Sequence, residues 1–151
     1  MSIPPMTASV MRHGESEQGI VWNILGQTYR PVQWCSSSLA FDTLFPPGTF
    51  VPPHVHSAQD EFVKVLDGAF ELWLDGQTEH AATGDLIRLP RGIAHGIFNK
   101  SDTPVRALFW LAPAMRLFEL FSLIHDVADP AEVMRLAALH DVHFLPPPPQ
   151  R

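Results

Sequence analysis

Short runs of apolar, β-branched and aromatic residues, separated by turn-forming residues, occupy the middle of this 151-residue sequence. Asp67-Gly68 and Asp75-Gly76 favour tight hairpins, because a type I′ turn needs a positive φ at both central residues. Strands this short and closely spaced predict a β-sandwich or β-barrel rather than a parallel α/β sheet. The predicted strands cover residues 38–45, 62–66, 69–74, 86–89, 95–99 and 105–111.

The pattern changes after Pro113, where apolar residues recur at helical spacing up to Ile124. A second helix is predicted from Asp129 as N-cap and Pro130 as the first helical residue. Both helices are too apolar to be free in solution, so they must pack on the barrel, on a sister chain, or on both. The apolar face of the first one is interpreted either as a lid over the barrel mouth or as a dimer contact.

Length and composition allow one ordinary domain with a hydrophobic core, since 46% of the residues are hydrophobic and 17% are charged. A net charge of −6 argues against a nucleic-acid backbone or an anionic membrane as the main partner. The predicted divisions are an N-terminal arm (1–19), a barrel (20–112), a helical segment (113–145) and a proline-rich tail (146–151).

No stretch approaches the roughly 18 to 20 apolar residues that span a bilayer. Residues 1–15 also lack the basic-then-apolar order of a signal peptide. We therefore expect a cytoplasmic protein.

Three histidines and one glutamate are candidate metal ligands. In an extended strand, side chains two residues apart lie on one face about 6.6 Å apart, so His54 and His56 can reach one ion if Val55 faces away. Glu61 is five residues after His56, so in a continuous strand it would point to the opposite face. The intervening residues must therefore turn, so that Glu61 reaches the site from the next strand. His95 opens a later strand and can point inward across a closed barrel. Such a donor set suits Fe, Ni, Mn, Co, Cu or Zn as a divalent ion.

The residues around these candidates resemble the two motifs of the cupin superfamily. The first block is Gly48, His54, His56, Glu61 and Gly68, and the second is Gly84, Pro90, Gly92, His95 and Asn99. More narrowly, residues 20–26, 90–95 and 111–113 and the aromatic-rich helix that follows them resemble the small cupins described as quercetin-dioxygenase-like. The resemblance implies an all-β fold, a double-stranded β-helix or jelly-roll barrel, followed here by the two C-terminal helices. It also implies one divalent metal ion on the three histidines and Glu61, and a homodimer. The glycines are interpreted as turn residues rather than a phosphate loop, so no other cofactor is expected.

A metal-dependent dioxygenase acting on a small aromatic or enolisable substrate is the predicted function. Glu61 is interpreted either as a catalytic base toward a phenol or enol proton or as a ligand alone. Strand parity places Val63 with Glu61 and Ile97 with His95 on the inward face, as substrate-lining candidates. The alternatives are a non-redox isomerase, lyase or dehydratase at the same site, and a small-molecule-binding cupin without turnover. Histidines that merely fill a metal-free barrel are a further alternative, although burying four ligand-type residues without an ion is costly.

Overall fold

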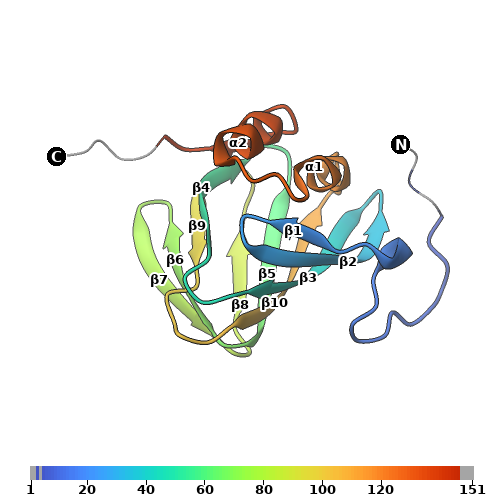
Figure 1. Ribbon diagram of the computed structural model, residues 1–151, viewed down its shortest axis with the longest axis horizontal. Helices are drawn as coiled ribbons and strands as arrows, with labels where there is room; N and C mark the ends of the chain where they lie inside the picture. The colour runs from blue at the N-terminus through green and yellow to red at the C-terminus, as the bar shows by residue number, and fades with distance from the viewer. Residues whose placement is uncertain (1–2, 4, 147–151) are drawn as a thin grey trace.

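Two antiparallel sheets make up most of the computed structural model, which describes residues 3 and 5–146 (Figure 1). The first sheet contains, in spatial order, β1 (Trp22–Ile24), β2 (Gln27–Cys35), β3 (Ser38–Phe45), β10 (Val105–Ala112), β5 (Asp60–Asp67) and β8 (Leu86–Leu89). The second contains β11 (Val142–Phe144), β4 (Phe50–His56), β9 (His95–Phe98), β6 (Ala69–Leu74) and β7 (Gln77–Ala82). The helices are the 3-10 turn η1 (Glu17–Gly19), α1 (Leu117–Ile124) and α2 (Pro130–Ala138).

The two sheets enclose the core between their inner faces. Along β3 and β10 buried residues alternate with half-buried ones, as expected when one face of a sheet is covered. Phe109 of β10 stacks on Phe41 and Phe45 of β3, with ring centroids 5.7 and 5.8 Å apart. The predicted double-stranded β-helix with two C-terminal helices is confirmed.

The two Asp-Gly dipeptides have different roles. Asp75 and Gly76 have φ values of 46° and 88° and join β6 to β7, which confirms the predicted hairpin. The hairpin predicted at Asp67-Gly68 is wrong, because β5 and β6 lie in different sheets and the chain crosses between them at this point. Gly68 has a φ of +105°, and a Cβ there would lie 2.9 Å from Val105 Cγ2. The glycine is therefore needed for a close crossing rather than for a two-residue turn.

Helices α1 and α2 cover one end of the barrel (Figure 1). Phe118 of α1 stacks face to face on Trp34 of β2, with centroids 3.7 Å apart and planes 3° apart. Asp129 is the N-cap of α2 and accepts a hydrogen bond from Ala131 N at 3.0 Å, as predicted. Beyond α2 the chain forms β11, a strand that the sequence did not predict, which pairs antiparallel with β4.

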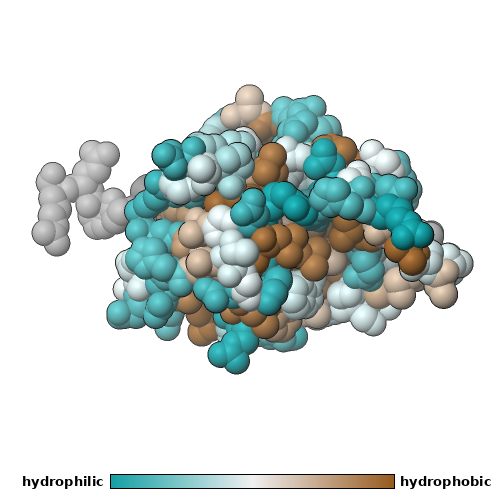
Figure 2. Space-filling view, turned by 90° about the horizontal axis from the view of Figure 1, so that it is seen from below, coloured by the Kyte–Doolittle hydropathy of each residue, from teal (hydrophilic) through white to brown (hydrophobic). Residues whose placement is uncertain are grey.

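The opposite end of the barrel, seen from below in Figure 2, carries apolar residues interspersed with hydrophilic ones. No helix in the described part of the chain has the length and apolarity needed to cross a membrane. Of the predicted proline-rich tail, residues 147–151 lie outside the described residues.

Candidate metal centre

Four buried side chains from three strands converge inside the barrel. His54 and His56 come from β4, Glu61 from β5 and His95 from β9, and one ligand atom from each lies within 4.8 Å of all the others. Their exposed fractions are 5, 6, 4 and 1%. The chain turns between the end of β4 and the start of β5, so Glu61 comes from the next strand along the chain, in the other sheet, as its parity required. The structure thus brings all four predicted ligand candidates together.

Two prolines set the local geometry of β4. The β4–β9 pairing places His54 opposite His95, but its register shifts between Val51 and His54. Pro52 and Pro53 occupy the shifted segment, and proline cannot donate a ladder hydrogen bond. The irregular pairing therefore follows from the sequence immediately before the first ligand.

Backbone carbonyls fix the tautomers of two histidines. His54 Nδ1 lies 2.8 Å from the Pro52 carbonyl oxygen, and His95 Nδ1 lies 3.1 Å from that of Ile93. A carbonyl oxygen only accepts, so each Nδ1 must carry a proton, and each Nε2 of the neutral ring turns a lone pair elsewhere. Metal-ligating histidines are commonly oriented by such contacts.

The carboxylate of Glu61 lies between two of the rings. Its Oε2 is 2.9 Å from His95 Nε2 and 3.2 Å from His56 Nε2. Two lone pairs repel at these distances, so each approach needs either a proton or a cation between the atoms. The four donors, three imidazoles and one carboxylate, fit a divalent transition-metal ion on these grounds.

The protonation preferences of the cluster agree with this geometry. Burial would raise the pKa of Glu61, but the charges and hydrogen bonds of His56 and His95 hold it well below its usual value. Burial, together with the charges of His95 and His56, lowers the pKa of His54 to about 3. Burial also opposes charge on His95, yet the hydrogen bond and charge of Glu61 outweigh it and raise that pKa. The lowered pKa of Glu61 and the raised pKa of His95 thus both favour positive charge beside the carboxylate.

His56 is held differently from the other two histidines. Its Nδ1 is buried and has no hydrogen-bond partner among the described residues. A buried polar atom without a partner is costly, so the fixed position of this ring depends on what binds its other nitrogen. The 3.2 Å approach of its Nε2 to Glu61 Oε2 is thus the polar contact that holds this ring among the described residues.

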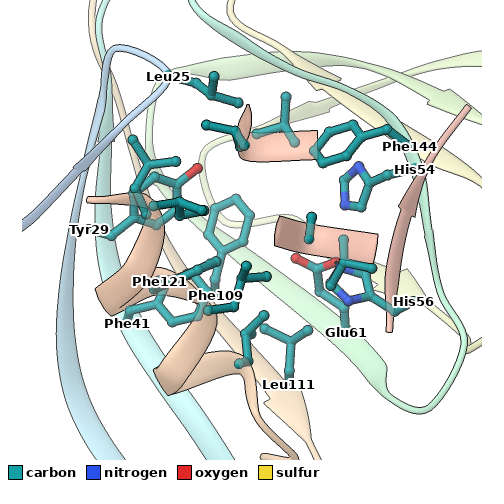
Figure 3. Close-up of a pocket in the computed structure, with 18 of the residues that line it drawn as sticks. Leu25, Tyr29, Phe41, His54, His56, Glu61, Phe109, Leu111, Phe121 and Phe144 are labelled. Atoms are coloured by element: carbon teal, nitrogen blue, oxygen red, sulfur yellow. Dashed lines mark ion pairs between the residues drawn. The ribbon is translucent and has the colours of Figure 1, made fainter. Parts of the chain in front are cut away.

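The quartet opens onto an apolar cavity (Figure 3). The wall is built by both sheets, by α1 and α2, and by β11. Besides His54, His56 and Glu61, its lining residues are Ile24, Leu25, Tyr29, Phe41, Val51, Ile97, Phe109, Leu111, Leu117, Leu120, Phe121, Ile124, Val133, Ala137, Val142 and Phe144. Ile97 therefore lines the cavity, whereas Val63 is fully buried on the same strand face as Glu61 and is not among the lining residues.

The aromatic wall was not identified from the sequence. Phe41 and Phe109 lie on β3 and β10, along which buried residues alternate with half-buried ones. This period-two pattern could have identified the inward faces of both strands. Tyr29 and Phe144 gave no comparable signal, because β2 contains Pro31 and polar residues and β11 has only three residues. The α1 residues on the wall agree with the lid interpretation of that helix.

A family model described as a cupin domain matches residues 41–111. The chain carries a cupin domain. The match contains all four ligand candidates and ends before α1, so the helices and β11 that complete the cavity lie outside it. The narrower resemblance to quercetin-dioxygenase-like cupins stays a prediction.

Similar proteins support this membership and come from several kinds of organism. A putative germin-like protein 9-2 from Oryza sativa subsp. japonica is 38% identical over an alignment of 77 residues that covers 47% of this chain and 36% of that protein. Polyketide synthase CurC from Streptomyces cyaneus is 33% identical over 67 residues, 44% of each chain. The solved structure of KdgF from Halomonas sp. superposes with a TM-score of 0.62 at 24% identity, over 71% of this chain and 94% of that one. The chain thus spans less than half the length of these two curated relatives, and the structural likeness concerns the fold.

Proposed function

We propose that this cupin is a metal-dependent dioxygenase that acts on an uncharged aromatic or enolisable small molecule. The observation that carries the proposal is the position of the buried His/Glu quartet at the wall of an apolar, aromatic-lined cavity. Apolar cavities with a few convergent polar groups are typical of small-molecule sites.

The cavity wall selects the class of substrate. Among the described residues that line it, Glu61 is the only acidic one and no lysine or arginine is present. A charged group on the substrate away from the quartet would lose its hydration without gaining a partner of opposite charge, which is costly. Rings such as those of Phe41, Phe109 and Phe121 instead offer surfaces for a flat aromatic molecule.

Glu61 is proposed to take the acidic proton of the substrate. A bound divalent ion would act as a Lewis acid that lowers the pKa of a coordinated phenol or enol. Under that condition a carboxylate with a low pKa is a sufficient acceptor, and Glu61 lies on the cavity wall where the proton would be released. His95 Nε2 lies 2.9 Å from the same carboxylate, so the nitrogen and Glu61 Oε2 would both face a bound ion.

Oxygen consumption tests the proposal directly. Protein loaded separately with iron(II) or nickel(II) would be assayed against a panel of flavonols and β-diketones, with metal-free protein as control. We expect metal-dependent oxygen uptake with at least one panel member, and incorporation of both atoms of isotopically labelled dioxygen into the product. The absence of uptake with every panel member would overturn the dioxygenase proposal.

A second candidate is a non-redox isomerase, lyase or dehydratase at the same site. It is favoured by one observation, the similarity to a protein named as a polyketide synthase, because polyketide chains carry enolisable carbonyl groups. This candidate predicts turnover under anaerobic conditions with zinc as the metal. The dioxygenase predicts none, so the same panel assayed without oxygen separates the two.

A further inference from the structure

Tyr29 lies across the cavity from the metal centre. In Figure 3 it is on the side opposite His54 and Glu61. Outside the ligand quartet, Tyr29 is the only residue with a polar side-chain group among the described residues that line the cavity. A molecule that reaches from the quartet to this side therefore meets one polar group there.

Gln27 determines which way the hydroxyl proton of Tyr29 points. The amide nitrogen of this fully buried glutamine donates to the Leu25 carbonyl at 3.0 Å and to that of Phe50 at 3.1 Å. Both amide protons are then in use, and Gln27 Oε1 accepts the hydroxyl proton of Tyr29 at 3.1 Å. The proton of Tyr29 is thus directed away from any ligand.

The phenol remains protonated and its ring is held firmly. Burial, together with the charge of Glu61, raises the pKa of Tyr29 far above its usual value. The ring contacts Phe41 and Phe121 at centroid distances of 5.5 and 5.4 Å. The Tyr29 oxygen has no hydrogen-bond partner other than Gln27 among the described residues, so a lone pair remains unused.

We propose that Tyr29 is a specificity-determining residue that accepts a hydrogen bond from a hydroxyl group of the substrate. That hydroxyl belongs to the part of the molecule far from the oxygen that meets the metal centre. The substrate class is then a hydroxylated flat aromatic rather than its methoxy or unsubstituted counterpart. The inference rests on the proposed function for the identity of the site, and it deepens that proposal.

Ligand binding without oxygen tests the inference independently of turnover. The probes are the parent flavonol and two matched series, in which one extra hydroxyl or one methoxy group is placed at successive positions of the distal phenyl ring and of the fused ring. Dissociation constants would be measured anaerobically with zinc-loaded protein. At one position or more, we expect the hydroxyl analogue to bind roughly five- to tenfold more tightly than both the methoxy analogue and the parent, the size of one hydrogen bond.

Two variants assign the preference to Tyr29. Tyr29→Phe keeps the ring and removes the acceptor, so we expect the hydroxyl analogue to fall to the affinity of the parent, which itself changes less than about twofold. Thr43→Val is the matched control, because Thr43 is also buried and its hydroxyl donates to Ala107 O at 2.9 Å away from the cavity lining. The Thr43→Val variant should retain the preference for the hydroxyl analogue.

The outcomes separate the two proposals. The role of Tyr29 is overturned if the wild type shows no hydroxyl preference at any position, or if the Tyr29→Phe variant keeps the preference. Oxygen uptake can still be observed in either case, so the dioxygenase proposal is tested separately. A hydroxyl preference lost in Tyr29→Phe supports that role even if no flavonol is turned over. Failure of every flavonol to bind overturns the role of Tyr29, whereas the dioxygenase proposal is then decided by oxygen uptake with the β-diketones of the panel.

Discussion

Phe144 of β11 lies directly opposite His54 of β4 in the antiparallel pairing, and their ring centroids are 5.3 Å apart. The strand that follows the C-terminal helices thus covers the strand that supplies two of the ligand candidates. The segment outside the family match takes part in the site in this way, both at the metal centre and along the cavity wall.

Removing the ring of Phe144 should weaken metal retention. Phe144→Ala exposes the edge of His54 to water, so we expect a chelator to remove the metal several-fold faster than from the wild type. The control is Phe50→Ala on the same strand as His54, because Phe50 is exposed and stacks only on Phe98 at 5.5 Å. Equal release rates in Phe144→Ala and the wild type would contradict this role of β11.

The Trp34–Phe118 stack should be a major anchor of α1. Both side chains are buried, and truncating a buried phenylalanine typically costs about 3–5 kcal/mol of unfolding free energy. We expect urea unfolding to show a decrease in the unfolding free energy of Phe118→Ala within that range. Leu123→Ala on the exposed side of α1 should lose less than about 1 kcal/mol. A small loss in Phe118→Ala would mean that the helix is anchored elsewhere.

Gly68 and Gly76 should respond differently to the same substitution. Both have positive φ values, +105° and +88°, but only at Gly68 does a Cβ meet Val105, while nothing lies within 4 Å at Gly76. We expect Gly76→Ala to cost about 1–2 kcal/mol from backbone strain and Gly68→Ala to cost roughly 1–3 kcal/mol more from the clash. Equal losses in thermal unfolding would argue against a close crossing at Gly68.

Removing the hydrogen-bond acceptor of the Tyr29 hydroxyl should change the ligand preference. Gln27→Met removes the acceptor, so the hydroxyl becomes able to donate to a methoxy oxygen, and we expect methoxy flavonols to gain several-fold in affinity. The variant also leaves the Leu25 and Phe50 carbonyls without their side-chain donor, so a stability loss of about 2 kcal/mol should accompany the gain. Unchanged methoxy affinity in the folded variant would show that Gln27 does not direct the proton.

Local sequence signals predicted the barrel strands well where they are bounded by turns. The strands at 38–45, 69–74 and 86–89 have the predicted bounds, and the quartet was found from motif spacing alone. β2 was missed because Pro31 interrupts its pattern, and the crossing at Gly68 because it depends on a contact with distant Val105. The aromatic wall and β11 likewise depend on packing between segments far apart in the chain, which a local pattern does not encode.

Metal content tests the central claim most directly. Wild-type protein, His95→Ala and His80→Ala, all purified without a metal-affinity tag, would be compared by elemental analysis. His80 is exposed on β7 and lies outside the quartet, so its variant controls for the loss of any histidine. We predict about one divalent transition-metal ion per chain in the wild type and in His80→Ala, and less than about a tenth of that in His95→Ala, because one of the four side chains that would bind the ion is lost. Equal metal content in His95→Ala and the wild type would contradict the four-ligand site.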